Sequence, residues 1–233
     1  MLKVAGLQAS YGRSQVLFDI DLEVGEGEIV TLLGRNGMGK TTTIRSVMGL
    51  TVPGQGAVEF AGRAIAGNTP ESIARAGIGL VPEGRQVFPL LTVFENLVAT
   101  ASNRLKRKNP WTLEEVFKLF PRLRERRNQY ARTLSGGEQQ MLAVGRALMT
   151  NPHLLIFDEA TEGLAPVIRA EIWGCISLLK SRGQSILIVD KNLSVLKRIA
   201  DRHFVIEKGR TVWRGSSADL DRDAAIVHRF VTV

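Results

Sequence analysis

Cysteine is almost absent from this chain. Its 233 residues include one cysteine, Cys175, which excludes an internal disulfide and favours a reducing compartment. The residue lies in a helical pattern over residues 170–180. We therefore expect a buried, unreactive thiol there.

Long apolar runs are also missing. No stretch approaches the roughly 18 apolar residues that a membrane-spanning helix needs, so any membrane role should be peripheral. The chain starts with a mixed, strand-like segment, without the basic start and apolar run of a signal peptide, and none is expected.

Acidic residues are in the minority. Lysine and arginine number 31 against 23 acidic residues, which gives a formal net charge of +8. This surplus suggests an acidic partner, either nucleotide, an anionic membrane surface or nucleic acid, and does not choose among them. Hydrophobic residues make up 44% of the chain, enough for the core of one large domain or a domain with a lobe.

Apolar strand-like runs alternate with helical patterns along most of the chain. This alternation predicts an α/β fold with a mainly parallel sheet. Helical residues 88–150 interrupt the pattern and should form a separate lobe within one domain, whose nucleotide-binding core would comprise residues 1–87 and 151–233. Strands are expected over residues 28–33, 78–81, 153–157 and 185–189, hairpins over 1–24, 51–67 and 203–213, and helices over 41–50, 71–76, 166–180, 193–200 and part of 217–233.

Local signals mark helix ends within residues 88–150. Thr92 with Glu95 is a capping-box pattern, and Thr112 with Glu115 opens a second helix that Pro121 should end. Phe117 and Phe120 lie on its apolar face and should be core. The basic runs 104–108 and 122–127 are expected to be solvated surface.

A phosphate-binding pattern stands out at residues 34–42, here called the phosphate loop. Gly34, Gly39, Lys40 and Thr41 fit G-x-x-x-x-G-K-[ST], between a predicted strand and a predicted helix. Glycines let backbone N–H groups approach phosphate oxygens, and the helix start adds unpaired donors. Lysine supplies a charge for the outer phosphates, and the threonine hydroxyl can hold Mg²⁺.

Two carboxylates follow the apolar run 154–157. Asp158 and Glu159 would emerge at the carboxyl end of a strand, where open α/β sheets bind ligands. Phosphoryl transfer needs a metal to neutralise charge and a group to orient water. Asp158 suits the metal together with Thr41, and Glu159 suits the water.

A third pattern, Leu-Ser-Gly-Gly-Glu at residues 134–138, precedes a helix. Ser135 and Glu138 form a capping box. Gly136 and Gly137 would each cost the first helical turn roughly 1 kcal/mol, so another role should favour them. Close approach of a phosphate to bare N–H groups is the physical candidate.

These patterns together resemble the ATPase subunits of ATP-binding cassette (ABC) transporters, over essentially the whole chain. The resemblance implies a cytoplasmic ATPase that dimerises head to tail around two ATP molecules, with the phosphate loop of one chain facing the signature stretch, residues 134–138, of the other. Tyr11 resembles the adenine-stacking aromatic, Glu159 the catalytic glutamate, and residues 163–166 the loop that couples the two sites.

The implied sites take in most of the residues discussed above. Glu159, Lys40 and Lys191 would be catalytic, and Thr41, Asp158 and Glu83 would bind Mg²⁺. ATP would contact Tyr11, Gly34, Arg35, Asn36, Gly37, Met38, Gly39, Lys40, Thr41, Thr42, Glu83, Ser135, Gly136, Gly137 and Glu138.

The segments 81–88, 91–97, 114–123 and 162–166 are similar to the ATPases of branched-chain amino acid uptake systems, LivF in type. This implies an importer with a second ATPase (identical or related), transmembrane permeases that contact the helical lobe, an extracytoplasmic binding protein, and a place on the cytoplasmic face of the inner membrane. ATPases for urea, amides or other hydrophobic amino acids are the alternative. Urea systems usually have glutamine at position 83, so Glu83 favours amino acids.

The chain departs from the family pattern at three positions. Glu83 replaces the glutamine that in most members touches Mg²⁺ and the attacking water. Lys191 stands where a histidine usually contacts the γ-phosphate, and it can meet that phosphate as a cation or be a solvated turn residue. Ala160 replaces a proline and should only loosen the following turn.

Two further functional classes fit parts of the sequence. The net charge permits an ABC ATPase that acts on nucleic acid or the ribosome, but those proteins generally carry two cassettes or a long insertion, and no direct nucleic acid contact is expected. A nucleotide-binding regulator without turnover is suggested by Glu83 and Lys191, and the intact pair Asp158 and Glu159 argues against it.

Overall fold

One mixed sheet organises the computed structural model, which describes residues 1–223 of the chain. The strand order within this part is β5-β4-β1-β2-β10-β9-β3-β8-β7-β6. The strands are β1 (Leu2–Tyr11), β2 (Ser14–Val24), β3 (Ile29–Leu33), β4 (Gln55–Phe60), β5 (Arg63–Ala64), β6 (Ile78–Val81), β7 (Leu154–Asp158), β8 (Ser185–Val189), β9 (Arg202–Glu207) and β10 (Arg210–Gly215).

The sheet has a parallel half and an antiparallel half. Strands β9, β3, β8, β7 and β6 pair in parallel, whereas β1, β2, β4 and β5 pair antiparallel. The halves join where β2 meets β10 through the pair Asp19 and Arg210, beside the carbonyl of Gly209, which accepts hydrogen bonds from the backbone N–H groups of Phe18 and Asp19. The predicted mainly parallel core with an antiparallel β subdomain is confirmed.

Buried side chains alternate between the two faces of the parallel strands, because successive residues of a strand point to opposite sides. In β3, Ile29 and Leu33 belong to one hydrophobic cluster, and Val30 and Leu32 belong to another. The first cluster also holds the apolar side chains of the helices of the inserted region, so these helices share one core with the sheet.

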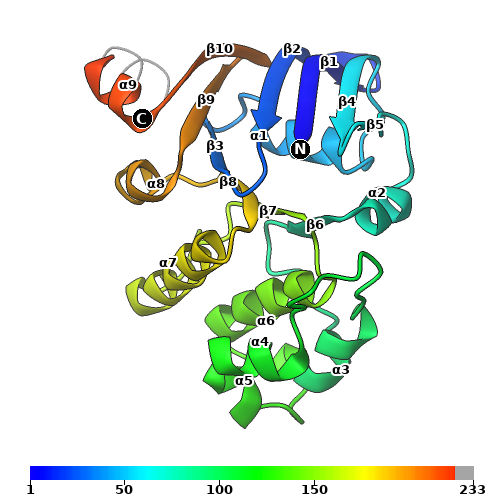
Figure 1. Cartoon of the computed structure of the whole chain (residues 1–233), viewed down its shortest axis with the longest axis vertical. Helices are drawn as coiled ribbons and strands as arrows, with labels where there is room; N and C mark the ends of the chain where they lie inside the picture. Colours follow the sequence, from blue (N-terminus) through cyan, green and yellow to red (C-terminus); the bar gives the residue numbers. More distant parts are fainter. Residues whose placement is uncertain (224–233) are drawn as a thin grey trace.

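The helices divide between the two faces. Helices α1 and α2 contribute to the cluster shared with β1, β2 and β4, and the later helices contribute to the other cluster. Figure 1 shows α3–α6 gathered at the opposite end of the molecule from β1, β2, β4 and β5. The helices are α1 (Lys40–Val47), α2 (Pro70–Ala76), α3 (Val93–Ala99), α4 (Leu113–Leu119), α5 (Pro121–Glu125), α6 (Gly136–Met149), α7 (Pro166–Ser181), α8 (Leu193–Ile199) and α9 (Ser217–Arg222), with a 3₁₀ turn at Ala131–Thr133.

Local capping signals correctly predicted helix starts. Thr92 and Ser135 form capping boxes at α3 and α6, and the Thr112 side chain accepts a hydrogen bond at the start of α4. Phe117 and Phe120 are core residues, as expected. The single cysteine is buried in α7, and burial raises the pKa of its thiol to about 12.

The prediction for residues 122–127 was incomplete. Pro121 ends α4 as expected, but it also begins α5, because proline has the backbone angle of a first helical residue and needs no N–H partner there. For the C-terminal segment 217–233, helix α9 confirms the helical start, and residues 224–233 lie outside the described part. Within residues 1–223, no helix combines the length and the apolar character needed to cross a membrane.

Candidate active site

The phosphate loop connects β3 to α1 through glycines that other residues could not replace. Gly34 has φ of +145°, and a Cβ there would overlap the carbonyl oxygen of Ile206. Gly39 caps α1 in a left-handed conformation, and a Cβ there would lie 2.7 Å from Leu17. These contacts hold the loop against β2 and β9 and leave its backbone exposed toward a ligand.

Lys40 is buried at the first position of α1. Its Nζ donates hydrogen bonds to the carbonyl oxygens of Gly34, at 2.8 Å, and Arg35, at 3.0 Å. Burial lowers the pKa of Lys40, and the charge of Glu159 partly opposes this effect. The ammonium is thus held inside the loop, where a phosphate would meet a partly desolvated cation.

Asp158 ends β7 directly beside the start of α1. The Thr41 hydroxyl donates a hydrogen bond to Asp158 Oδ1 at 3.4 Å. Asp158 is almost completely buried, and burial, followed by the charge of Glu83, raises its pKa to about 6. The hydroxyl and carboxylate are oxygen donors of the kind that Mg²⁺ prefers.

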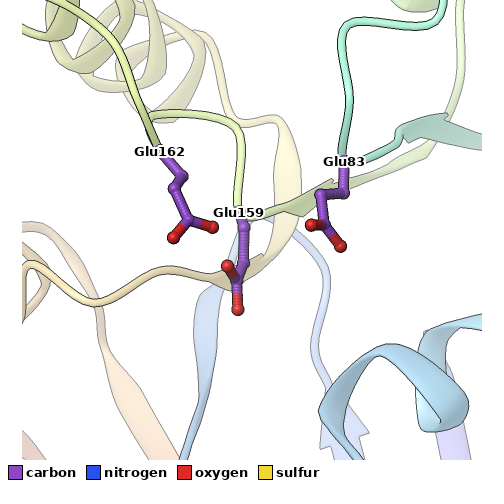
Figure 2. Close-up of side chains that lie close together, drawn as sticks. All are labelled: Glu83, Glu159 and Glu162. Atoms are coloured by element: carbon purple, nitrogen blue, oxygen red, sulfur yellow. The ribbon is translucent and has the colours of Figure 1, made fainter. Parts of the chain in front are cut away.

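Glu159 meets two other glutamates. Figure 2 shows Glu83, from the segment after β6, beside Glu159 and Glu162 of the turn after β7, and one carboxylate oxygen of each lies within 4.8 Å of the others. Burial, followed by the hydrogen bond and charge of Glu162, raises the pKa of Glu159 to about 7. The same hydrogen bond, followed by Lys191, lowers the pKa of Glu162. Glu159 therefore retains a proton more readily than its neighbour.

Lys191 lies beside these acids. Its Nζ forms an ion pair with Glu162 and lies 3.7 Å from Glu159 Oε2. The hydrogen bond to Glu162 raises the pKa of Lys191, so it stays a cation. Asp190, directly before Lys191, connects the turn after β8 to the turn after β7, because it accepts a hydrogen bond from the Thr161 hydroxyl at 2.5 Å.

A cavity of about 450 Å³ lies between the phosphate loop and the acids. It brings together residues from the ends of three strands and the start of α1, as expected for an open α/β sheet. Eight of the predicted residues line it together with Val16 and Glu162, whereas Asp158 and Lys191 lie outside its lining. The lining consists of Val16, Asn36, Gly37, Gly39, Lys40, Thr41, Thr42, Glu83, Glu159 and Glu162.

Tyr11 ends β1 outside the lining of this cavity, with about half of its surface exposed. Burial raises the pKa of its hydroxyl, but the neighbouring polar side chains of Thr51 and Thr42 and the charge of Arg45 outweigh burial and lower the pKa. The side chain therefore lies beside α1. Its role in base stacking stays a prediction.

The signature stretch lies at the start of α6, and its residues are not part of the lining of the 450 Å³ cavity. The Ser135 N–H donates a hydrogen bond to Glu138 Oε2 at 2.8 Å, and Arg126 pairs with Glu138 Oε1 at 2.5 Å. The capping role is thus observed directly. A phosphate contact for Gly136 and Gly137 stays a prediction.

Two residues of this region were missed by the sequence analysis. Arg85 donates a hydrogen bond from Nη2 to the carbonyl oxygen of Gly163 at 3.1 Å, and its guanidinium fills the space where Gly136 would carry a Cβ. It connects the segment after β6 to both the signature stretch and the turn before α7. The other residue is Glu162, which the sequence analysis noted only as part of a family pattern, although that pattern was a usable signal.

Comparisons with known proteins agree with this geometry. A family model described as "ABC transporter" matches residues 17–162. The branched-chain amino acid transport ATP-binding protein BraG of Pseudomonas aeruginosa is 42% identical over 94% of each chain. The Nod factor export ATP-binding protein I of Cupriavidus pinatubonensis is 37% identical, over 94% of this chain and 67% of the relative.

Solved structures show the same fold. The ATP-binding subunit of an ABC transporter superposes with a TM-score of 0.85 at 29% identity, and the match covers 97% of this chain and 94% of the other. The expected resemblance to ATPases of branched-chain amino acid transport is confirmed by the BraG match.

Proposed function

Since the chain belongs to the ABC transporter family and is the ATP-hydrolysing subunit of a transporter, we propose that it powers an importer of branched-chain amino acids. Similarity to BraG at 42% identity over nearly the full length of both chains supports the substrate class. The cavity shared by Lys40, Thr41 and Glu159 supports the chemistry.

The loop amides and Lys40 would bind the β- and γ-phosphates, in place of the carbonyl contacts that Lys40 makes now. Thr41 and Asp158 would hold Mg²⁺, with Glu83 as a further oxygen donor. When bound, Mg²⁺ neutralises charge on the transferred phosphoryl group.

Glu159 would orient and deprotonate the attacking water. Its carboxylate lines the cavity opposite the phosphate loop, and its raised pKa suits a general base near neutral pH. Lys191 would leave Glu162 and contact the γ-phosphate, because its ammonium already lies 3.7 Å from Glu159.

ABC cassettes work as dimers with transmembrane permeases. We infer that two phosphate loops each receive Ser135, Gly136 and Gly137 of the partner chain, since the signature stretch of the same chain lies outside its own phosphate cavity. Tyr11 would stack on the adenine. Arg35, Met38 and Thr42 of the phosphate loop would complete the nucleotide site, and Glu138 would contact ATP as part of the signature stretch that the partner chain presents.

The partners follow from the proposed class. A second ATPase, identical or related, would complete the dimer, permeases would contact the α3–α6 lobe, and an extracytoplasmic binding protein would deliver substrate. The chain would sit peripherally on the cytoplasmic face of the inner membrane. Direct nucleic acid contact is not proposed.

The experiment reconstitutes the chain with its own permeases and binding protein in liposomes. With Glu159→Gln, nucleotide binding should persist, whereas phosphate release should fall by about 10²–10⁴-fold, the usual contribution of a general base. Glu59→Gln, an exposed acid on β4, is the matched control and should hydrolyse ATP normally. Undiminished hydrolysis by the Glu159 variant would refute the assignment.

Transport assays then identify the substrate. ATP-dependent uptake of leucine, isoleucine and valine is expected, and urea or amide uptake without amino acid uptake would replace the proposal. Export instead of uptake is the second candidate, favoured by the 37% identical export relative. Hydrolysis with neither movement would leave the ATPase assignment intact and reject the importer.

A further inference from the structure

A second polar cavity, of about 890 Å³, lies far from the phosphate loop. His153 and Gln184 line it, and they directly precede β7 and β8. Asp158 is the last residue of β7, at its other end, and Glu159 follows it. Because each of these strands has five residues, it spans roughly 17 Å, so the two cavities are separate.

The outer wall of this cavity is a fixed segment, residues 105–111. The Asn151 side chain accepts a hydrogen bond from the Trp111 N–H at 2.6 Å and donates to the carbonyl oxygens of Trp111, at 3.2 Å, and Ser102, at 3.0 Å. Arg107 Nη1 donates to the Pro152 carbonyl and, at 2.8 Å, to Gln184 Oε1. The wall is therefore attached to the β7 and β8 edge at both ends.

Positive charge is in surplus around the cavity. Lys106, Arg107, Lys108 and Arg182 line it, and Glu115 is the acid among its lining residues. Glu115 is already engaged, because it pairs with Lys118 at 3.0 Å and with Arg182 at 3.2 Å. Glu115 therefore does not neutralise the three cations of the wall segment, Lys106, Arg107 and Lys108.

Arg107 makes the surplus costly. Its guanidinium is partly buried, burial alone lowers its pKa, and its hydrogen bonds go to a carbonyl and an amide oxygen. Among residues 1–223, no carboxylate forms an ion pair with it. A partly buried charge without a counter-ion is unfavourable, and an anion in the adjacent cavity would supply one.

We propose that this cavity binds a phosphate-bearing anion between Arg107 and the two exposed lysines, Lys106 and Lys108. A guanidinium donates to two oxygens at once, and ammonium groups add charge from the rim, a combination that suits phosphate groups. The volume is that of a small-molecule site. A free polyphosphate and a phospholipid headgroup offer the same chemistry, and the experiment separates them.

The first arm measures calorimetric binding of inorganic tripolyphosphate to the full chain in Mg²⁺-free buffer. All proteins carry Lys40→Ala, which weakens the phosphate loop. The double variant Lys106→Ala/Lys108→Ala should bind about tenfold more weakly or worse, because two charge-assisted contacts are lost. These side chains are exposed, so folding should persist, and thermal unfolding checks this.

A matched control removes the same charge elsewhere, with Arg63→Ala and Arg198→Ala on β5 and α8. Both are exposed in the structure. The control should bind tripolyphosphate as the parent does. Arg107→Lys, which keeps the charge and loses the guanidinium geometry, should weaken binding as well.

The second arm sediments the chain with vesicles of phosphatidylglycerol mixed with phosphatidylcholine, and with phosphatidylcholine alone. The site is assigned to a lipid headgroup by three results together. The parent binds the anionic vesicles, the Lys106→Ala/Lys108→Ala variant does not, and tripolyphosphate blocks the binding. Tripolyphosphate binding without vesicle binding assigns it to a free anion. Failure to bind either probe, or equal losses in the pocket and control variants, would overturn the proposal.

Discussion

Replacing Glu162 with glutamine should shift the pH dependence of ATP hydrolysis to lower pH. Burial, followed by the hydrogen bond and charge of Glu162, raises the pKa of Glu159 to about 7. Glutamine removes the neighbouring charge and leaves burial in place. Below its pKa Glu159 is protonated and cannot accept a proton from water, so a lower pKa extends activity into more acidic solution.

The size of the shift follows from the geometry. Two carboxylate charges within 4.8 Å repel by about 3.5 kcal/mol at an effective dielectric constant of roughly 20. Glu162 is 46% exposed and pairs with Lys191, so solvent and the ammonium screen much of this repulsion. We expect a shift of about one pH unit, which corresponds to about 1.4 kcal/mol.

The assay is kcat/KM for phosphate release by the assembled transporter, measured at ATP concentrations well below KM from acid to neutral pH, because this ratio reports the pKa values of the nucleotide-free site. Lys191→Ala provides the opposite test, because the Lys191 charge lowers the pKa of Glu159 and its loss should move the acid limb to higher pH. The reasoning would be refuted if the fall in activity at low pH were the same for the Glu162 variant and the parent. It would also be refuted if the two variants shifted the pH profile in the same direction.

Two predictions concern stability. Burial lowers the pKa of His203 to about 4 from 6.5, so the unfolded chain binds the proton first and stability should fall by up to about 3 kcal/mol as pH drops from 6.5 to 4. Urea unfolding at several pH values should show this loss reduced in His203→Gln and unchanged in His153→Gln. Gly209 has φ of +71° and a Cβ there would overlap the Val16 carbonyl, so Gly209→Ala should cost about 1–3 kcal/mol. Gly174→Ala, in a helix with open space, should add about 0.5–1 kcal/mol, and equal unfolding midpoints for the two alanine variants would contradict this account.

Local interactions were the part of the fold that the sequence predicted well. The sequence signals for the strand at residues 78–81 and for the capping boxes of Thr92 and Ser135 lie within three or four positions, and each element was placed correctly. Helix α5 was missed because Pro121 was interpreted only as a helix end, although proline is also favoured at a helix start.

Contacts between distant segments were the part that the sequence could not predict. Arg85 and Gly163 are 78 positions apart, and nothing in either residue type indicates that they meet. Lys191 and Glu162, 29 positions apart, were each noticed, but their ion pair depends on how the turns after β7 and β8 approach each other. The phosphate loop could be predicted because its pattern is contiguous, whereas the second cavity is built from three separate segments.

One electrostatic imbalance accounts for several features of the site. Four carboxyl groups, those of Asp158, Glu83, Glu159 and Glu162, meet at the site, and the cations that act on this group are Lys40, Lys191 and, at Asp158, Arg45. Burial raises the pKa values of Asp158 and Glu159 first, and the charges of the neighbouring carboxylates add to the rise, so the site retains protons that reduce its negative surplus. A divalent cation that arrives with the nucleotide removes the same surplus and favours ionisation of these carboxyls. The charge balance that weakens Glu159 as a base in the resting site would therefore be reversed when the nucleotide binds with its cation.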